Sequence, residues 1–530
     1  MRSYYSHLEA IKTVGENISL SQKPVFRSSA IFPVIQNSDY SSKILFMGYW
    51  LVKRHITEIG LLYTLRNAKG NLLSRKYLLI DTAKAFNIEI AEFSEVIKKA
   101  GSESDFTGSL ELEIFSTKDL VFPYPAFVLV YCNEHFSTAV HTVGRIYNDI
   151  EDLKVNEEYK VRESGFDIYG DDSIEPFIAL TNGPIENKNP VIEYKINNSH
   201  GQEYTGSFSI PALAPLETTF IKLNEYIDLK KLLQKQPGTI KFAHNFEGFF
   251  PRFLVGNIDT ASKAISITHS YYDSSELSDD KSYWNRKDEA FNDSSVAIPL
   301  YLKDDYYTHL AIYPIFSPSD FTLSFEFFDQ QGNPKGKLNQ YKPIRSADNK
   351  YETIDFGAIV EAEKFDPHSI KSVNITCNWE NKTKIPTRIK FGLNVGIKNR
   401  DVKFPSNICF APQLGNPNIL QKKSTFRWAP FINVGNSEIV LTNSSPLKAY
   451  NQDAHVVLTF YREADNATLE KSAIIKANAI EVIHAQKDSD IKDFFAGGTG
   501  WMTVHADNPF LNGWYFDFHL NGAVAADHIF

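Results

Sequence analysis

Apolar and polar residues alternate along many short stretches of this chain, and turn-forming residues follow them. In the stretch 191–197, Ile192, Tyr194 and Ile196 fall on one side of an extended backbone, while Glu193 and Lys195 fall on the other. A period of two with one polar face is typical of a half-buried β-strand. The glycines that follow such stretches supply the positive φ that a tight hairpin needs. The pattern therefore predicts strands joined by hairpins.

This pattern recurs four times, at an interval of about 130 residues. The first landmark is an alternating strand, found at 108–114, 238–242, 371–375 and 500–504. The second landmark is a turn residue that closes an upstream strand, namely Gly70, Gly201, Gly332 and Asn466. Because two independent landmarks share one period, we interpret the chain as four copies of one structural unit.

Each unit is expected to hold about six or seven short strands, with frequent turns and one short helical segment. The segment 225–233, for example, places Leu229, Leu232 and Leu233 at the spacing of one helical face. Long helical patterns do not alternate with the strands, which disfavours a parallel α/β fold. We therefore predict an all-β fold of four tandem antiparallel β-sandwich units, immunoglobulin-like in shape, with short helical segments.

Polar connections mark the expected domain boundaries. The residues 147–176 are rich in Asp and Glu, and 273–295 and 412–426 are also polar. The divisions that follow are an N-terminal extension at 1–40 and β-sandwich units at 41–150, 151–275, 276–412 and 413–530.

Composition narrows the range of partners. The net charge is −9 and the isoelectric point is about 5.9, whereas a nucleic-acid partner would need clustered Lys and Arg. We therefore expect no nucleic-acid partner. The three Cys residues are far apart and odd in number, so they predict no disulfide framework.

The first twenty residues lack the apolar core of a signal peptide, and no apolar run approaches the ~20 residues that span a membrane. We therefore expect no membrane span and a cytoplasmic location. Export by a route without a cleaved signal stays open.

No familiar catalytic or cofactor motif is present: there is no phosphate-binding loop, nucleophile elbow, His-Glu-x-x-His or Cys-x-x-Cys. We therefore expect no cofactor and assign no catalytic residue. The four units end on residue types that bind metals or transfer protons, namely His141, His269, Cys409 and His528. Equivalent positions in tandem units usually lie far apart, so we favour separate structural roles over a metal site.

The densest cluster of candidate ligand-binding residues lies in the second unit: Arg252, His269, Tyr271, Tyr272 and Asp273. On one strand, His269, Tyr271 and Asp273 would share a face. Tyr could then stack on a sugar while Arg and Asp hydrogen-bond to it. The simpler interpretation is a Tyr-rich strand end with a buried Arg–Asp pair.

The first unit repeats part of this cluster, so His141 and Arg145 join the candidate ligand-binding residues.

The fourth unit ends in a strand with aromatic residues on both faces. We expect an interface there, formed by Trp514, Phe516, Phe518 and Phe530. One sandwich core can cover only one face of a strand, so a second covering surface is needed. It could be the N-terminal forty residues, the third unit, or a second copy of the chain in a homo-oligomer.

Two functions fit these observations. The first is a non-catalytic binding or structural protein that recognises a glycan or a protein partner through clefts between its units. The second is an enzyme that acts on a carbohydrate or a related small polar substrate, with its site in the second unit. The enzyme interpretation requires Arg252, His269 and a carboxylate to converge in a concave pocket.

Overall fold

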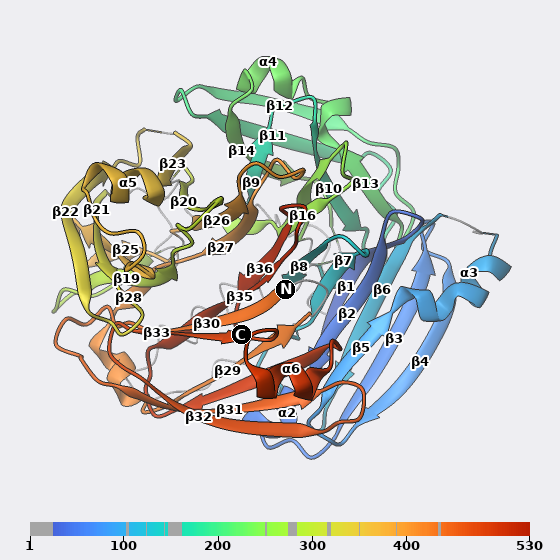
Figure 1. Ribbon diagram of the computed structural model, residues 1–530. Helices are drawn as coiled ribbons and strands as arrows, with labels where there is room; N and C mark the ends of the chain where they lie inside the picture. The colour runs from blue at the N-terminus through green and yellow to red at the C-terminus, as the bar shows by residue number, and fades with distance from the viewer. Residues whose placement is uncertain are drawn as a thin grey trace. The chain divides into compact units, whose positions relative to one another are not determined.

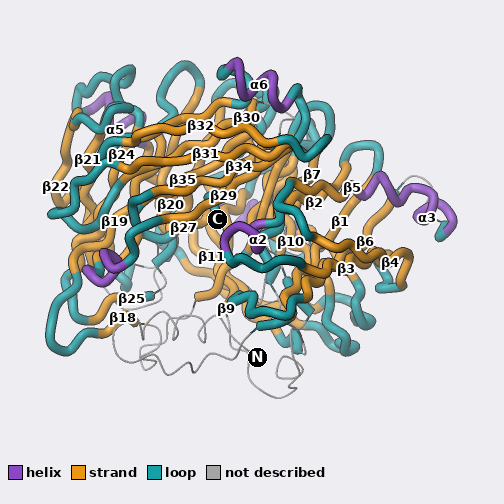
Figure 2. The backbone as a smooth tube through the Cα atoms, turned by 90° about the horizontal axis from the view of Figure 1, so that it is seen from below, coloured by secondary structure: helices purple, strands orange, loops and turns teal. Residues whose placement is uncertain are grey.

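The structure is a computed structural model, and it describes residues 25–101, 105–122, 125–141, 144–146, 162–247, 249, 252–273, 283–314, 320–348, 350–387, 389–432 and 436–530. Strands dominate this part of the chain, and the helices are few and short (Figure 2). The paired strands of this part of the chain run antiparallel, and eight of its nine sheets form four two-sheet sandwiches. The predicted all-β fold of four tandem sandwiches is therefore confirmed.

The first sandwich pairs a sheet of order β1-β6-β3-β4 with one of order β5-β2-β7-β8 (Figure 1). Its strands are β1 (Arg27–Gln36), β2 (Ser41–Met47), β3 (Ile59–Asn67), β4 (Leu72–Ile80), β5 (Ala85–Glu89), β6 (Phe106–Phe115), β7 (Val128–Cys132) and β8 (Ser137–His141). Its helical segments are α2 (Tyr49–Lys53), η1 (Ile90–Phe93) and α3 (Ser94–Lys99).

The second sandwich pairs β12-β11-β14-β9-β17 with β13-β10-β15-β16. Its strands are β9 (Arg162–Tyr169), β10 (Ile174–Thr181), β11 (Val191–Asn198), β12 (Glu203–Ser209), β13 (Thr218–Lys222), β14 (Pro237–His244), β15 (Leu254–Asp259), β16 (Ile265–His269) and β17 (Tyr271–Asp273). Its helical segments are η3 (Leu223–Glu225) and α4 (Leu229–Leu233).

The third sandwich pairs β22-β21-β24-β19-β28 with β23-β20-β26-β27. Its strands are β19 (Asn292–Pro299), β20 (Tyr306–Ile312), β21 (Phe321–Phe328), β22 (Pro334–Ile344), β23 (Glu352–Asp355), β24 (Ser372–Trp379), β26 (Phe391–Ile397), β27 (Ser406–Phe410) and β28 (Gln413–Gly415). The helix α5 (Phe356–Ala362) belongs to it, and the strands β18 (Tyr283–Asn285) and β25 (Lys384–Pro386) form a separate pair.

The fourth sandwich pairs β29-β34-β31-β32 with β33-β30-β35-β36. Its strands are β29 (Thr425–Phe431), β30 (Asn436–Asn443), β31 (Ala454–Arg462), β32 (Thr468–Ile475), β33 (Ile480–His484), β34 (Gly500–Ala506), β35 (Leu511–Phe518) and β36 (Val524–His528). The segments η5 (Pro417–Gln421) and α6 (Ser489–Phe495) complete the helices.

The same strand order in all four sandwiches explains the sequence repeat. The alternating landmark strands are β6, β14, β24 and β34, which occupy the same place in their sheets. Each contributes an equivalent side chain with no solvent exposure, namely Leu110, Ile240, Val373 and Met502. The turn residues Gly70, Gly201, Gly332 and Asn466 all have positive φ, between 61° and 83°.

The first strand begins earlier than the sequence pattern indicated. The segment 1–40 was expected to precede the first unit, but β1 lies inside it and pairs with β6 along its whole length. Eight of the ten residues of β1 are buried. A strand covered on both faces has no alternation of polar and apolar residues, so its sequence does not have the pattern of a half-buried strand.

The described chain divides into two compact units. The first contains the described residues up to Ile196 together with Glu203–Tyr272, and the second contains Asn197–Gln202 and Asp273–Phe530. Most of the first two sandwiches therefore belongs to the first unit, and the third and fourth belong to the second.

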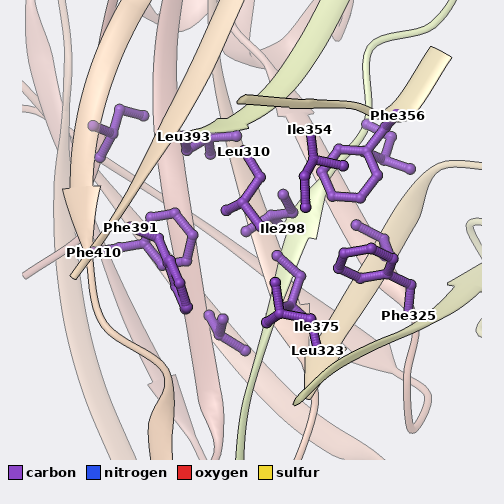
Figure 3. Packing of buried hydrophobic residues seen from close by; sticks show 14 of the residues in the cluster. Ile298, Leu310, Leu323, Phe325, Ile354, Phe356, Ile375, Phe391, Leu393 and Phe410 are labelled. Carbon is purple, nitrogen blue, oxygen red and sulfur yellow. The ribbon is translucent and has the colours of Figure 1, made fainter. Parts of the chain in front are cut away.

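One apolar core runs through the third and fourth sandwiches. In the third sandwich, Leu323, Phe325 and Ile375 from one sheet pack with Leu310 and Leu393 from the other (Figure 3). The same cluster of buried residues extends into the fourth sandwich through Val440, Ile480, Trp514 and Phe516. Because this core is shared, separating the two sandwiches would expose apolar surface, and their relative placement is fixed by packing.

A backbone joint links the sandwiches within each unit. The tip of the β3–β4 hairpin accepts a hydrogen bond at Ala68 O from Thr218 N, at 2.8 Å. The tip of the β21–β22 hairpin does the same at Gln330 O, which accepts from Ile480 N at 3.1 Å. Thr218 and Ile480 begin the equivalent strands β13 and β33, so one joint occurs twice.

Candidate functional site

The candidate ligand-binding residues His141 and His269 lie at the ends of two edge strands. The strand β8 is the edge of its sheet in the first sandwich, and β16 is the edge of its sheet in the second. These strands pack on each other within the first unit, where Ile267 N donates to Thr138 Oγ1 at 3.0 Å. The chain therefore brings together two residues that are far apart in sequence.

The two imidazole rings contact each other at this seam, with centroids 4.7 Å apart and planes perpendicular. The prediction that the closing residues of the four units lie separately is wrong for this pair. The reason is topological, because the last strand of each sandwich is an edge strand and edge strands can pack on a neighbouring sandwich.

Arg252 completes the cluster. Its Nη2 lies 2.8 Å from Nδ1 and 2.9 Å from Nε2 of His269, and its Nε donates to Ser270 O at 3.1 Å. His269 Nδ1 also lies 2.9 Å from Ser270 O. In one tautomer of the ring, Nδ1–H donates to the Ser270 carbonyl and Nε2 accepts from the guanidinium. His269 itself is 6% exposed, whereas Arg252 and His141 are partly exposed.

The other candidate residues of this region have different surroundings. Arg145 is buried on the segment after β8, where Gly144 O accepts from Ile31 N at 2.8 Å. Tyr271, Tyr272 and Asp273 form β17, which borders β9, and their side chains lie outside the described part of the structure. Ser270 was missed by the sequence analysis, because its carbonyl group carries the contact and a backbone group leaves no sequence signal.

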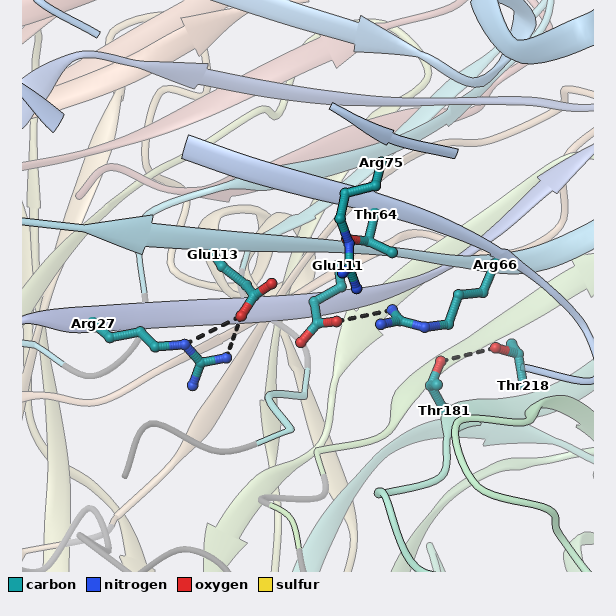
Figure 4. Close-up of polar contacts among 8 residues, drawn as sticks. All are labelled: Arg27, Thr64, Arg66, Arg75, Glu111, Glu113, Thr181 and Thr218. Atoms are coloured by element: carbon teal, nitrogen blue, oxygen red, sulfur yellow. Dashed lines mark hydrogen bonds and ion pairs between the residues drawn. The ribbon is translucent and has the colours of Figure 1, made fainter. Parts of the chain in front are cut away.

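Further charged residues are buried in the first unit. Arg66 on β3 and Glu111 on β6 form an ion pair of 2.8 Å, while Arg27 pairs with Glu113 on the same sheet (Figure 4). Burial, and then the neighbouring Glu113, raise the pKa of Glu111, although the Arg66 guanidinium opposes both effects. A buried pair of this kind is weak evidence for stability, because the cost of desolvating both charges offsets much of their attraction.

Two cavities formed by described residues lie in the second unit, and neither is lined by Arg252, His269 or His141. The larger is an open groove of about 840 Å³ beside the connection between the third and fourth sandwiches. Its side chains include the cations Lys422, Lys423 and Lys448, together with Tyr450 and Asp507. The smaller cavity, of about 470 Å³, lies between residues of the two sandwiches.

Asp507 carries the carboxylate among these five groove residues, and His455 binds it. Its backbone N–H and its Nδ1 each lie 2.8 Å from an oxygen of Asp507. Burial alone would raise the pKa of Asp507, but these hydrogen bonds from His455 lower it below the usual range. The Asp507 carboxylate therefore stays ionised at neutral pH beside the three lysines.

The expected interface residues are covered largely by this chain itself. Trp514 is 1% exposed, its indole N–H donates to Ala297 O at 3.3 Å, and its ring meets Phe410 edge-on. Phe516 and Phe518 each contact Tyr301, with ring centroids 5.2 Å apart. The third sandwich is therefore a surface that covers this strand. Phe530 packs instead on Trp428 and Trp501 of its own sandwich.

Comparison with known proteins adds little. No family model matches the chain, and no curated protein matches it. Among solved structures, a biofilm-associated protein BSP domain is 9% identical, with 95% of this chain and 96% of that chain covered and a TM-score of 0.15. Dimeric latent PorU from Porphyromonas gingivalis is 11% identical, with 74% and 34% covered and a TM-score of 0.13. Scores this low carry no argument about function. Within the described residues, no helix is long and apolar enough to cross a membrane.

Proposed function

We propose that this protein is a non-catalytic binding protein that recognises a glycan through clefts between its sandwiches. The observation that carries the proposal is the apolar core shared by the third and fourth sandwiches. A junction held by packing keeps the cavities beside it in one shape, and a preformed site avoids the entropy cost of ordering on binding.

The groove beside this junction supports the proposal chemically. Lys422, Lys423 and Lys448 provide cationic donors, and Tyr450 provides an aromatic ring edge-on to Phe510 at 4.6 Å. Aromatic rings pack on the apolar faces of sugars, and charged donors bind their hydroxyl or acidic groups.

The test is a glycan array probed with the whole purified chain. We expect binding to be lost in the double variant Lys422→Glu/Lys448→Glu and kept in Lys364→Glu, which changes an exposed lysine that lines neither cavity. Each glycan that binds would then be incubated with the protein, and the recovered glycan would be analysed by mass spectrometry. Recovery of cleaved product would favour an enzyme, and binding only to a protein partner would remove the glycan from the proposal.

A further inference from the structure

The smaller cavity of the second unit has a buried carboxylate at its wall. Glu438, on β30, is 4% exposed. One of its oxygens accepts from the Tyr301 hydroxyl, and the other lies 2.9 Å from His484 Nδ1. Burial, and then the Glu438 charge, raise the pKa of Tyr301 well above its ordinary value, so the phenol keeps its proton and remains a donor. Glu438 is therefore a fixed acceptor inside the cavity.

Lysines line the same cavity. Lys303, Lys371 and Lys487 contribute to its surface, and no ion pair joins them to a carboxylate within the described part of the chain. Burial, and then the neighbouring Lys303 ammonium, lower the pKa of Lys371, while Asp366 acts weakly in the opposite direction. Two ammonium groups that repel each other would both gain from an anion placed between them.

Part of the remaining wall is aromatic, and the rest is mainly aliphatic, with residues such as Ile370 and Val440. Tyr306 and Phe518 lie edge-on with centroids 5.4 Å apart, and Tyr301 contacts both rings. Asp304 is exposed and also lines the cavity. With Glu438, it disfavours a ligand that carries several negative charges. A volume of about 470 Å³ is larger than a bare inorganic anion needs.

We propose that this cavity binds an acidic sugar residue, of the uronic acid class. The sugar carboxylate is held between Lys303 and Lys371, the apolar face of the ring lies on the aromatic wall, and a ring hydroxyl donates to Glu438. The assignment deepens the proposed function and rests on it, because it names the class of sugar that one cleft would select.

The experiment compares ligands on the unmodified protein by calorimetry. The probes are glucuronate and galacturonate, their neutral counterparts glucose and galactose, and inorganic phosphate. We expect the uronates to bind about tenfold or more tightly than the neutral sugars, because a charge-assisted hydrogen bond adds at least that factor. Equal binding of both sugar classes, or equally tight binding of phosphate, would overturn the inference.

Two variants locate the site. Lys303→Gln/Lys371→Gln should lose the preference for uronates, whereas Lys364→Gln should keep it. Melting temperatures check that both variants fold, and if the double variant does not, the single Lys303→Gln is used. Suppose that glycan-array binding is lost in Lys422→Glu/Lys448→Glu but unchanged in Lys303→Gln/Lys371→Gln. That result would refute this inference and leave the proposed function standing.

Discussion

Replacing Gly332 by Ala tests the backbone joint between the third and fourth sandwiches. Gly332 has φ of +83°, and a Cβ there would lie 2.4 Å from Ala477 O and 2.8 Å from Ala479 N. Both are backbone atoms, so no side-chain rotation relieves the clash. The turn itself is held by Asp329 Oδ1, which accepts from Gln331 N and Asn333 N at 2.9 Å.

The expected destabilisation has two parts. A left-handed backbone costs an Ala residue about 1–2 kcal/mol. Displacing the hairpin tip also loses the bond from Ile480 N to Gln330 O, which contributes about 1 kcal/mol, and adds strain at the clash. We therefore expect Gly332→Ala to lower the free energy of unfolding by about 2–4 kcal/mol.

Gly201 provides the matched control. It occupies the equivalent turn with φ of +75°, but a Cβ there would meet nothing within 4 Å. Gly201→Ala should therefore cost only the backbone part, about 1–2 kcal/mol. Urea denaturation followed by tryptophan fluorescence and circular dichroism measures both variants. If the two midpoints shift equally, the joint contributes nothing and the reasoning is refuted.

Two buried side chains, Ile240 and Trp514, and one partly buried histidine, His244, give further predictions. Ile240→Asp should cost several kcal/mol, because Ile240 is fully buried and an unpaired charge there has no compensation; an unchanged melting temperature would contradict this. Trp514→Ala should cost about 3–5 kcal/mol yet leave the mass in light scattering unchanged, because the ring packs within this chain; a change of mass would instead indicate contact with a second copy. Burial lowers the pKa of His244 to about 4, from an ordinary value of 6.5, while Phe246 N donates to its Nδ1. The unfolded chain therefore binds this proton more readily, and the stability contributed by the neutral ring, on the order of 2 kcal/mol, is full above pH 6.5 and is lost as the pH falls towards 4. His244→Gln should flatten this part of the stability profile, and an unaltered profile would show that the ring does not cause it.

The repeat was predictable because its signal is local, namely the alternation of apolar and polar residues within single strands. Leu110, Ile240, Val373 and Met502 sit in alternating strands, and a period of two is visible without any knowledge of tertiary contacts. The strand β1 was not predictable in this way, because burial on both faces removes the alternation.

The candidate sites were harder, because they depend on how one sandwich meets another. Residue types suggested Arg252 and His269, but only the packing of β8 on β16 brings His141 to them. Lys371 and Glu438 line one cavity, but Lys371 belongs to the third sandwich and Glu438 to the fourth. No local spacing links them, so sequence patterns alone could not group them.

The repeated joint has a consequence for how such a chain can diverge. In both units a backbone N–H meets a backbone carbonyl, and the residues that carry these groups differ, Thr218 and Ala68 in one and Ile480 and Gln330 in the other. Both hairpin tips also carry a glycine whose Cβ position is occupied by neighbouring backbone, Gly70 and Gly332. The relative placement of two joined sandwiches thus depends on main-chain atoms and on one glycine. The side chains around the joint are therefore free to change. Sandwiches could therefore exchange most of their surface residues, and acquire different ligands, while the joint between them keeps its geometry.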